Sequence, residues 1–150
     1  MNLTITVEDR IIHCIYKSVD QIEDLVKIAD EYEGKISGRY GMNFPISIIK
    51  KTKSNIIKEI LKYTKSAEYV IVYKKGDYKT KMHELQHAKY YIDAKFREDV
   101  KQLWDSLQSK YKSNIIYMLK KMGYPDHVLL DEFQAYYYTE KDNFFGKKSW

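Results

Sequence analysis

The sequence predicts an α+β fold, and three observations lead to this prediction. Segments rich in β-branched and aromatic residues are mixed with segments of helical periodicity, without the regular strand–helix–strand alternation of an α/β fold. Only six glycines and two prolines occur in 150 residues, and no Ser/Gly-rich linker divides the chain. Hydrophobic residues make up 44% and charged residues 31%, which is typical of a globular protein with a real core. We therefore expect one domain spanning residues 1–150.

The first third of the chain is expected to form a strand, a helix and a loop. Residues 11–16 (IIHCIY) are β-branched and aromatic, which favours a strand. A helix should follow, with Asp20 as its N-cap and Glu23 three positions later as the capping-box partner. Its helical periodicity ends at Gly34. Residues 38–45 are expected to form a loop.

The middle of the chain predicts a helix, a strand and a long helix. Ser54 caps a helix expected over residues 54–65, and residues 68–73 (EYVIVY) have the composition of a strand. After a turn at residues 74–77, Thr80 is expected to cap a helix that continues without interruption to about residue 107. Its apolar stripe is expected to contain Met82, Leu85, Ile92, Phe96, Val100 and Leu103.

Two shorter helices complete the expected order of elements. The first covers about residues 114–122 and stops at Gly123. The second follows Pro125 and Asp126 and covers about residues 127–139.

Composition and charge disfavour several classes of protein. No segment approaches the roughly 18 uninterrupted apolar residues of a membrane helix, and the first ten residues do not resemble a secretory signal. We therefore expect a cytoplasmic protein without a membrane partner. The single cysteine, Cys14, excludes an internal disulfide and is expected to be a small buried hydrophobe. The net charge is +5, but only three of the 26 cationic residues are arginines, so a nucleic-acid partner is disfavoured.

Residues 83–87 read His-Glu-Leu-Gln-His, the HExxH pattern. Side chains at positions i and i+4 share one face of a helix, so His83 and His87 can bind a single zinc ion. Glu84 lies between them and can act as general base on a water molecule that the metal activates. Both histidines lie more than about 90° from the apolar stripe, where a histidine of the core would be expected. The sequence therefore predicts a zinc site on this helix.

Zinc needs a third protein ligand, and two carboxylates are candidates. Glu132 falls in the inward-facing stripe of the last helix, where an unpaired carboxylate would be costly, and is the preferred ligand. Asp93 lies ten residues after His83, but on a straight helix it would be about 9 Å along the axis from His87. Asp131 points about 100° away from Glu132 and is expected to be a solvated charge.

These residues carry a resemblance to a known family. The segments HELQHA (83–88) and DEFQAY (131–136) together resemble the gluzincins, the HExxH…E branch of the zinc metallopeptidases. The expected order of backing helix (54–65), edge strand (68–73) and active-site helix is similar to that of minimal zincins and of lethal-factor-type catalytic domains. The resemblance covers residues 50–140. It implies a zincin-like fold, in which a small mixed sheet has a backing helix, an active-site helix and a C-terminal helix that carries the third ligand.

The resemblance also implies a function and the residues that perform it. We expect zinc-dependent hydrolysis of peptide bonds, with Zn²⁺ held by His83, His87 and Glu132 and with Glu84 as general base. Gluzincins usually add a Tyr or His that stabilises the oxyanion, and Tyr136 and Tyr124 are the candidates here. The strand at 68–73 is expected to pair with an extended protein or peptide substrate.

Two alternatives remain for a chain with these features. One is a non-catalytic zincin-fold binding module, in which the zinc only holds structure. Glu84 argues against it, since a structural site has no use for a carboxylate between two ligands. The other is a basic, nucleic-acid-associated protein of the SprT-like kind, against which the scarcity of arginine speaks.

Overall fold

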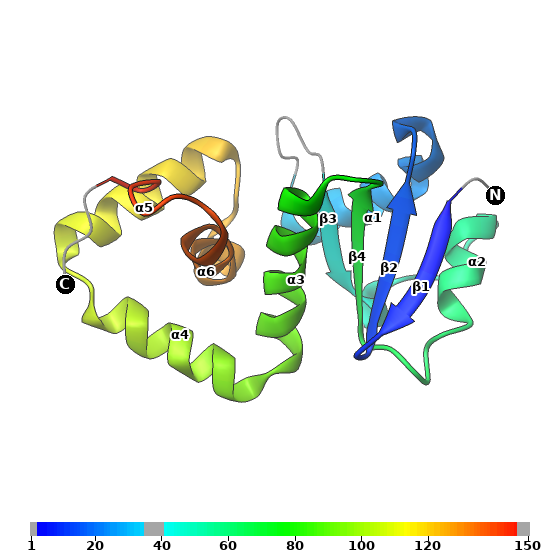
Figure 1. Ribbon diagram of the computed structural model, residues 1–150, viewed down its shortest axis with the longest axis horizontal. Helices are drawn as coiled ribbons and strands as arrows, with labels where there is room; N and C mark the ends of the chain where they lie inside the picture. Colours follow the sequence, from blue (N-terminus) through cyan, green and yellow to red (C-terminus); the bar gives the residue numbers. More distant parts are fainter. Residues whose placement is uncertain (1–2, 35–40, 147–150) are drawn as a thin grey trace.

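The computed structural model describes residues 3–34 and 41–146, which form a small mixed sheet and six α-helices (Figure 1). The strands are β1 (Thr4–Glu8), β2 (Ile11–Tyr16), β3 (Met42–Pro45) and β4 (Tyr69–Lys74). The helices are α1 (Glu23–Glu33), α2 (Asn55–Leu61), α3 (Tyr78–Ile92), α4 (Ala94–Ser106), α5 (Ser109–Met122) and α6 (Leu129–Thr139). The prediction of an α+β fold is therefore confirmed, and both strands expected from the sequence are present.

The sheet has the order β1-β2-β4-β3. The central strands β2 and β4 run parallel, and each edge strand is antiparallel to its neighbour. The prediction that residues 68–73 form an edge strand is wrong, because β4 is paired on both sides and cannot accept a substrate strand. The prediction of a loop at 38–45 is wrong for residues 42–45, which form the edge strand β3, and residues 38–40 lie outside the described residues.

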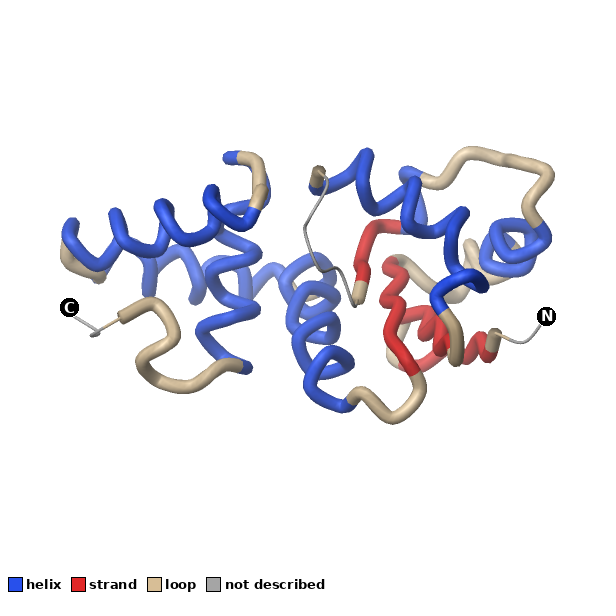
Figure 2. The backbone as a smooth tube through the Cα atoms, turned by 90° about the horizontal axis from the view of Figure 1, so that it is seen from above, coloured by secondary structure: helices blue, strands red, loops and turns tan. Residues whose placement is uncertain are grey.

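The two faces of the sheet are covered by different helices, as Figures 1 and 2 show from two directions. On one face, Val70 and Val72 of β4 pack in a core with residues of α1 and α2. On the other face, Tyr69, Ile71 and Tyr73 pack against Ala88 of α3. Because side chains alternate along a strand, a strand buried on both faces needs an almost continuous apolar sequence, and β4 has one. Cys14 lies fully buried in the first core, as expected.

Helices α4, α5 and α6 lie on the side of α3 away from the sheet (Figure 1). They enclose a second apolar cluster around Phe133, with Val100, Ile115 and Leu119 among its buried members. Helix α6 contacts α3 directly, so one side of α3 faces the sheet and another faces α6. Among the residues that the structure describes, none of the helices combines the length and the apolar character needed to cross a membrane.

The single long helix expected from Thr80 to about residue 107 is wrong. Helix α3 ends at Ile92 and α4 begins at Ala94, with Asp93 in an extended conformation between them. The Asp93 carboxylate accepts a hydrogen bond from the backbone N–H of Phe96 at 3.1 Å, so it caps α4. The apolar periodicity continues across this break, which is why the sequence pattern did not reveal it.

Other helix boundaries differ from the expected ones by a few residues. Asp20 lies inside a 3₁₀ turn (Val19–Ile22) instead of capping α1, and Ser18 with Gln21 forms the capping box of that turn. Helix α3 is capped by Asp77, which accepts hydrogen bonds from the N–H and the hydroxyl of Thr80. Helix α5 begins at Ser109, five residues before the predicted start. Met82, expected in the apolar stripe, is 52% exposed.

Candidate metal centre

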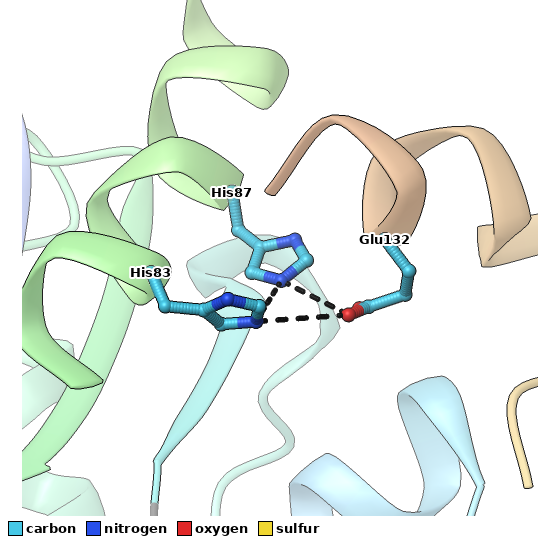
Figure 3. Close-up of side chains that lie close together, drawn as sticks. All are labelled: His83, His87 and Glu132. Atoms are coloured by element: carbon cyan, nitrogen blue, oxygen red, sulfur yellow. Dashed lines mark hydrogen bonds and ion pairs between the residues drawn. The ribbon is translucent and has the colours of Figure 1, made fainter. Parts of the chain in front are cut away.

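Helix α3 presents three different faces, and His83, Glu84 and His87 occupy two of them. Leu85, Ala88 and Ile92 pack toward the sheet. His83 and His87, one turn apart, point toward α6, as Figure 3 shows. Glu84 lies on the remaining face, which meets the edge strand β3.

His83, His87 and Glu132 converge at the contact between α3 and α6 (Figure 3). The Nε2 atoms of the two histidines are 3.2 Å apart. The Oε1 atom of Glu132 lies 3.3 Å from Nε2 of His87 and 3.8 Å from Nε2 of His83. His87 and Glu132 are each 1% exposed. The structure therefore brings the three expected ligands together in a group that could hold a metal ion.

The donor atoms of this group fit a cation. Glu132 Oε1 is buried and, among the described residues, makes no hydrogen bond. A buried carboxylate oxygen without a hydrogen bond is costly, and a metal ion between it and the two imidazoles would reduce that cost. Burial alone would raise the pKa of Glu132, but the adjacent imidazoles of His87 and His83 outweigh burial and hold this pKa below its ordinary value. Glu132 is therefore an anionic ligand at neutral pH.

Asp131 orients the imidazole of His87, which corrects its prediction as a solvated charge. Nδ1 of His87 donates to Oδ1 of Asp131 at 2.9 Å, which leaves Nε2, the nitrogen that faces Glu132, as the atom that could bind a metal. Gln134 donates to the same Asp131 oxygen at 2.9 Å and to the backbone carbonyl of Gln86 at 3.1 Å, which ties α6 to α3. The interval of three residues places Asp131 and Gln134 on one face of a helix but does not indicate which element that face meets.

Glu84 is buried beside the cluster and is not one of its members. Its Oε2 accepts a hydrogen bond from Nδ2 of Asn43 on β3, at 3.1 Å. Burial, the largest effect, raises the pKa of Glu84, although the nearby imidazoles of His83 and His87 act in the opposite direction. A carboxyl group with a raised pKa accepts and releases protons more readily near neutral pH. Sequence reasoning missed Asn43, because nothing in its local sequence marks it.

Tyr124 and Tyr136 meet beside the histidines. Their hydroxyl oxygens are 2.9 Å apart, and the ring of Tyr136 packs edge-on against His83 with centroids 4.6 Å apart. Burial raises the pKa of Tyr136 to about 12 and also raises that of Tyr124. Both side chains are therefore neutral hydroxyl donors at physiological pH. The two candidates left open by the sequence thus form one pair at the same site.

Asp93, the other carboxylate considered as a third ligand, lies away from this group. It is exposed at the junction of α3 and α4, where its side chain caps α4. The expectation that Asp93 does not ligate agrees with this position. The physical reason differs from the expected one. The sequence argument placed Asp93 too far along an unbroken helix, whereas in the structure α3 ends at Ile92 and Asp93 caps the next helix.

No family model matches the chain, and no match is found among the curated proteins or the solved structures. The function must therefore be argued from the geometry of the centre and from the residues that build it.

Proposed function

We propose that this protein is a zinc-dependent metallopeptidase of the gluzincin type, with a zincin-like arrangement of sheet and helices. The observation that carries the proposal is the convergence of His83, His87 and Glu132 beside a buried glutamate that is not part of the ligand group. A structural zinc site uses four protein ligands, whereas a catalytic one keeps a position open. Three ligands and an adjacent base are the composition of a catalytic site.

The spacing of the donor atoms supports zinc as the metal. Zinc binds imidazole nitrogen and carboxylate oxygen at about 2.0–2.2 Å, so two ligands at tetrahedral positions lie about 3.3 Å apart. The three separations here are 3.2, 3.3 and 3.8 Å. The donor set of two imidazoles and one carboxylate also suits zinc better than magnesium or calcium, which prefer oxygen ligands.

The residues around the centre supply the remaining chemistry. Zinc, when bound, would acidify a water molecule and polarise the scissile carbonyl. Glu84 takes the proton from the attacking water and later delivers it to the leaving amine. Tyr136 and Tyr124 share one hydrogen bond, so the hydroxyl whose proton is not used in it would donate to the oxygen that becomes negative in the transition state. Asp131 keeps the His87 imidazole in the tautomer that a ligand requires.

The edge strand β3 is the candidate for substrate pairing. It is the last strand of the sheet among the described residues and contacts α3. An extended peptide could add to its outer edge and so run along the helix that carries His83 and Glu84. This replaces residues 68–73 as the proposed pairing strand.

The test is to separate metal binding from hydrolysis with Glu84→Gln. This substitution preserves the size of the side chain but removes the basic carboxylate. We expect the variant to keep about one zinc per chain while hydrolysis of a peptide library falls by roughly 10²–10⁴-fold. Phenanthroline should abolish cleavage by the wild type, and added zinc should restore it.

The opposite result would support the non-catalytic module. In that case the wild type would bind zinc, no peptide would be cleaved in a zinc-dependent way, and Glu84→Gln would behave as the wild type in every assay.

A further inference from the structure

Strand β3 directs alternate side chains to opposite faces of the sheet. Met42 and Phe44 belong to the core shared with α1 and α2, so Asn43 between them faces α3. Its register agrees, because Asn43 pairs with Ile71, which packs in the cluster against α3. Asn43 is only 2% exposed, and a buried amide needs hydrogen-bond partners.

Both ends of the Asn43 amide are engaged. Nδ2 donates to Oε2 of Glu84 at 3.1 Å, and the hydroxyl of Tyr69 donates to Oδ1. An ionised carboxylate can only accept hydrogen bonds, so the amide must present its nitrogen to Glu84. The tyrosine on the carbonyl side favours the same orientation. A chain of hydrogen bonds therefore runs from β4 through β3 to α3.

Gly41 brings the backbone before β3 against the same carboxylate. A Cβ atom at this position would lie 3.1 Å from Cγ and 3.2 Å from Cδ of Glu84, and 2.4 Å from Cγ2 of Thr80. The backbone thus passes directly over the side chain of Glu84. Any side chain at position 41 would crowd Glu84, and rotation of the Glu84 side chain would break its bond to Asn43.

We infer that Asn43, fixed by Tyr69, is a positioning residue that holds Glu84 in the orientation required of the general base. The inference rests on the proposed function. With Oε2 held by Asn43, Oε1 is the oxygen that takes the proton from water. Asn43 acts through Glu84 and does not itself contact the reacting atoms. Orientation matters here because a misplacement of about 1 Å can cost on the order of 10²-fold in rate.

The first experiment compares Asn43→Ala with Glu84→Gln and with the double variant. We expect Asn43→Ala to keep its zinc and to lose about 10–100-fold in kcat with little change in KM. In the Glu84→Gln background, Asn43→Ala should cause no further loss, because the base that it orients is gone. A merely structural role would give losses that add.

A matched pair of tyrosines on β4 guards against misfolding of the alanine variant. Tyr69 and Tyr73 face the same side of the sheet, but the Tyr73 hydroxyl contacts His13 (3.0 Å) instead of Asn43. Tyr69→Phe should lower kcat by several-fold, and Tyr73→Phe should leave it unchanged. Equal effects of the two substitutions would overturn the inference.

A spectroscopic measurement tests the contact without using activity. In ¹⁵N-labelled protein, the side-chain amide signal of Asn43 is the one that disappears in Asn43→Asp. Glu84→Gln should shift this signal and leave the other asparagine amides in place. An unchanged signal would mean that Asn43 does not hold Glu84.

The failure of this inference differs from the failure of the proposed function. If the wild type hydrolyses peptides and Asn43→Ala has a normal kcat or loses its zinc, only the positioning role of Asn43 is overturned. The absence of zinc-dependent hydrolysis in the wild type overturns both, even if the amide signal still depends on Glu84.

Discussion

Glu132 and Asp93 are both carboxylates that follow the motif, but their side chains have different partners. Glu132 faces two imidazole nitrogens and has an unsatisfied buried oxygen, whereas Asp93 caps a helix. We expect Glu132→Ala to weaken zinc binding by more than about 100-fold, measured by competition with a chromophoric chelator. Asp93→Ala should retain zinc and lose about 1 kcal/mol of unfolding free energy, because its N-cap is lost. If Asp93→Ala strips the metal, the assignment of the third ligand is wrong.

Asp131 contributes through the imidazole that it orients. Asp131→Asn keeps the shape of the side chain but removes the charge that holds the Nδ1 proton of His87. Zinc affinity should fall by about 10–100-fold, as it does when such partners of metal-bound histidines are changed. Asp126→Asn is the matched control, because that exposed carboxylate pairs with Lys120 at 2.8 Å outside the centre. Equal zinc affinities of the two variants would contradict the role of Asp131.

At the scale of elements, the pattern of apolar residues predicted those helices and strands whose position depends on burial. The spacing of apolar residues located α2, α6 and the helix that carries HExxH, and the β-branched and aromatic composition of residues 11–16 located β2. It could not locate β3, which has four residues, ends in proline and reads as a loop. The break at Asp93 was not predicted because the apolar period does not change there. The break is marked by one side chain, that of Asp93, which caps α4.

In the candidate site, too, some residues could be predicted from the sequence and others could not. The sequence indicated the HExxH motif by its spacing. It indicated Glu132 because a charged side chain is unusual on an apolar stripe. The partners Asn43 and Asp131 could not be predicted, because each depends on which element packs beside α3. Hydrogen bonds between elements are set by tertiary packing, which leaves little trace in local sequence.

The close approach of α3 and the segment before β3 can be tested at Gly41. Gly41→Ala would place a methyl group 2.4 Å from Cγ2 of Thr80, and we expect a loss of about 1–3 kcal/mol in urea unfolding. Thr80→Ser removes that methyl but keeps the hydroxyl that bonds Asp77, so alone it should be nearly neutral. The double variant should recover part of the loss. Unchanged stability of Gly41→Ala would show that the segment can move away from α3 without cost.

At the scale of the whole molecule, the candidate centre lies between two apolar clusters. One cluster packs α3 against the sheet, and the other encloses Phe133 among α4, α5 and α6. Between them, the contact of α3 with α6 contains His83, His87 and Glu132, together with Asp131 and Gln134. Buried charged groups stabilise a contact weakly, and removal of one partner leaves another uncompensated. A bound cation would therefore add stability at the contact between α3 and α6.

Zinc should accordingly raise the thermal stability of the whole molecule. A ligand that binds only the folded state adds about 2.7 kcal/mol at a free concentration of 100 times its Kd. For a chain of 150 residues, this corresponds to an increase in Tm of about 5–10 °C, measured by calorimetry with and without chelator. Magnesium should have no such effect, because it prefers oxygen ligands. The control is His83→Ala, which lacks one ligand and should show no shift. An equal shift in that variant would mean that zinc stabilises the protein from another site.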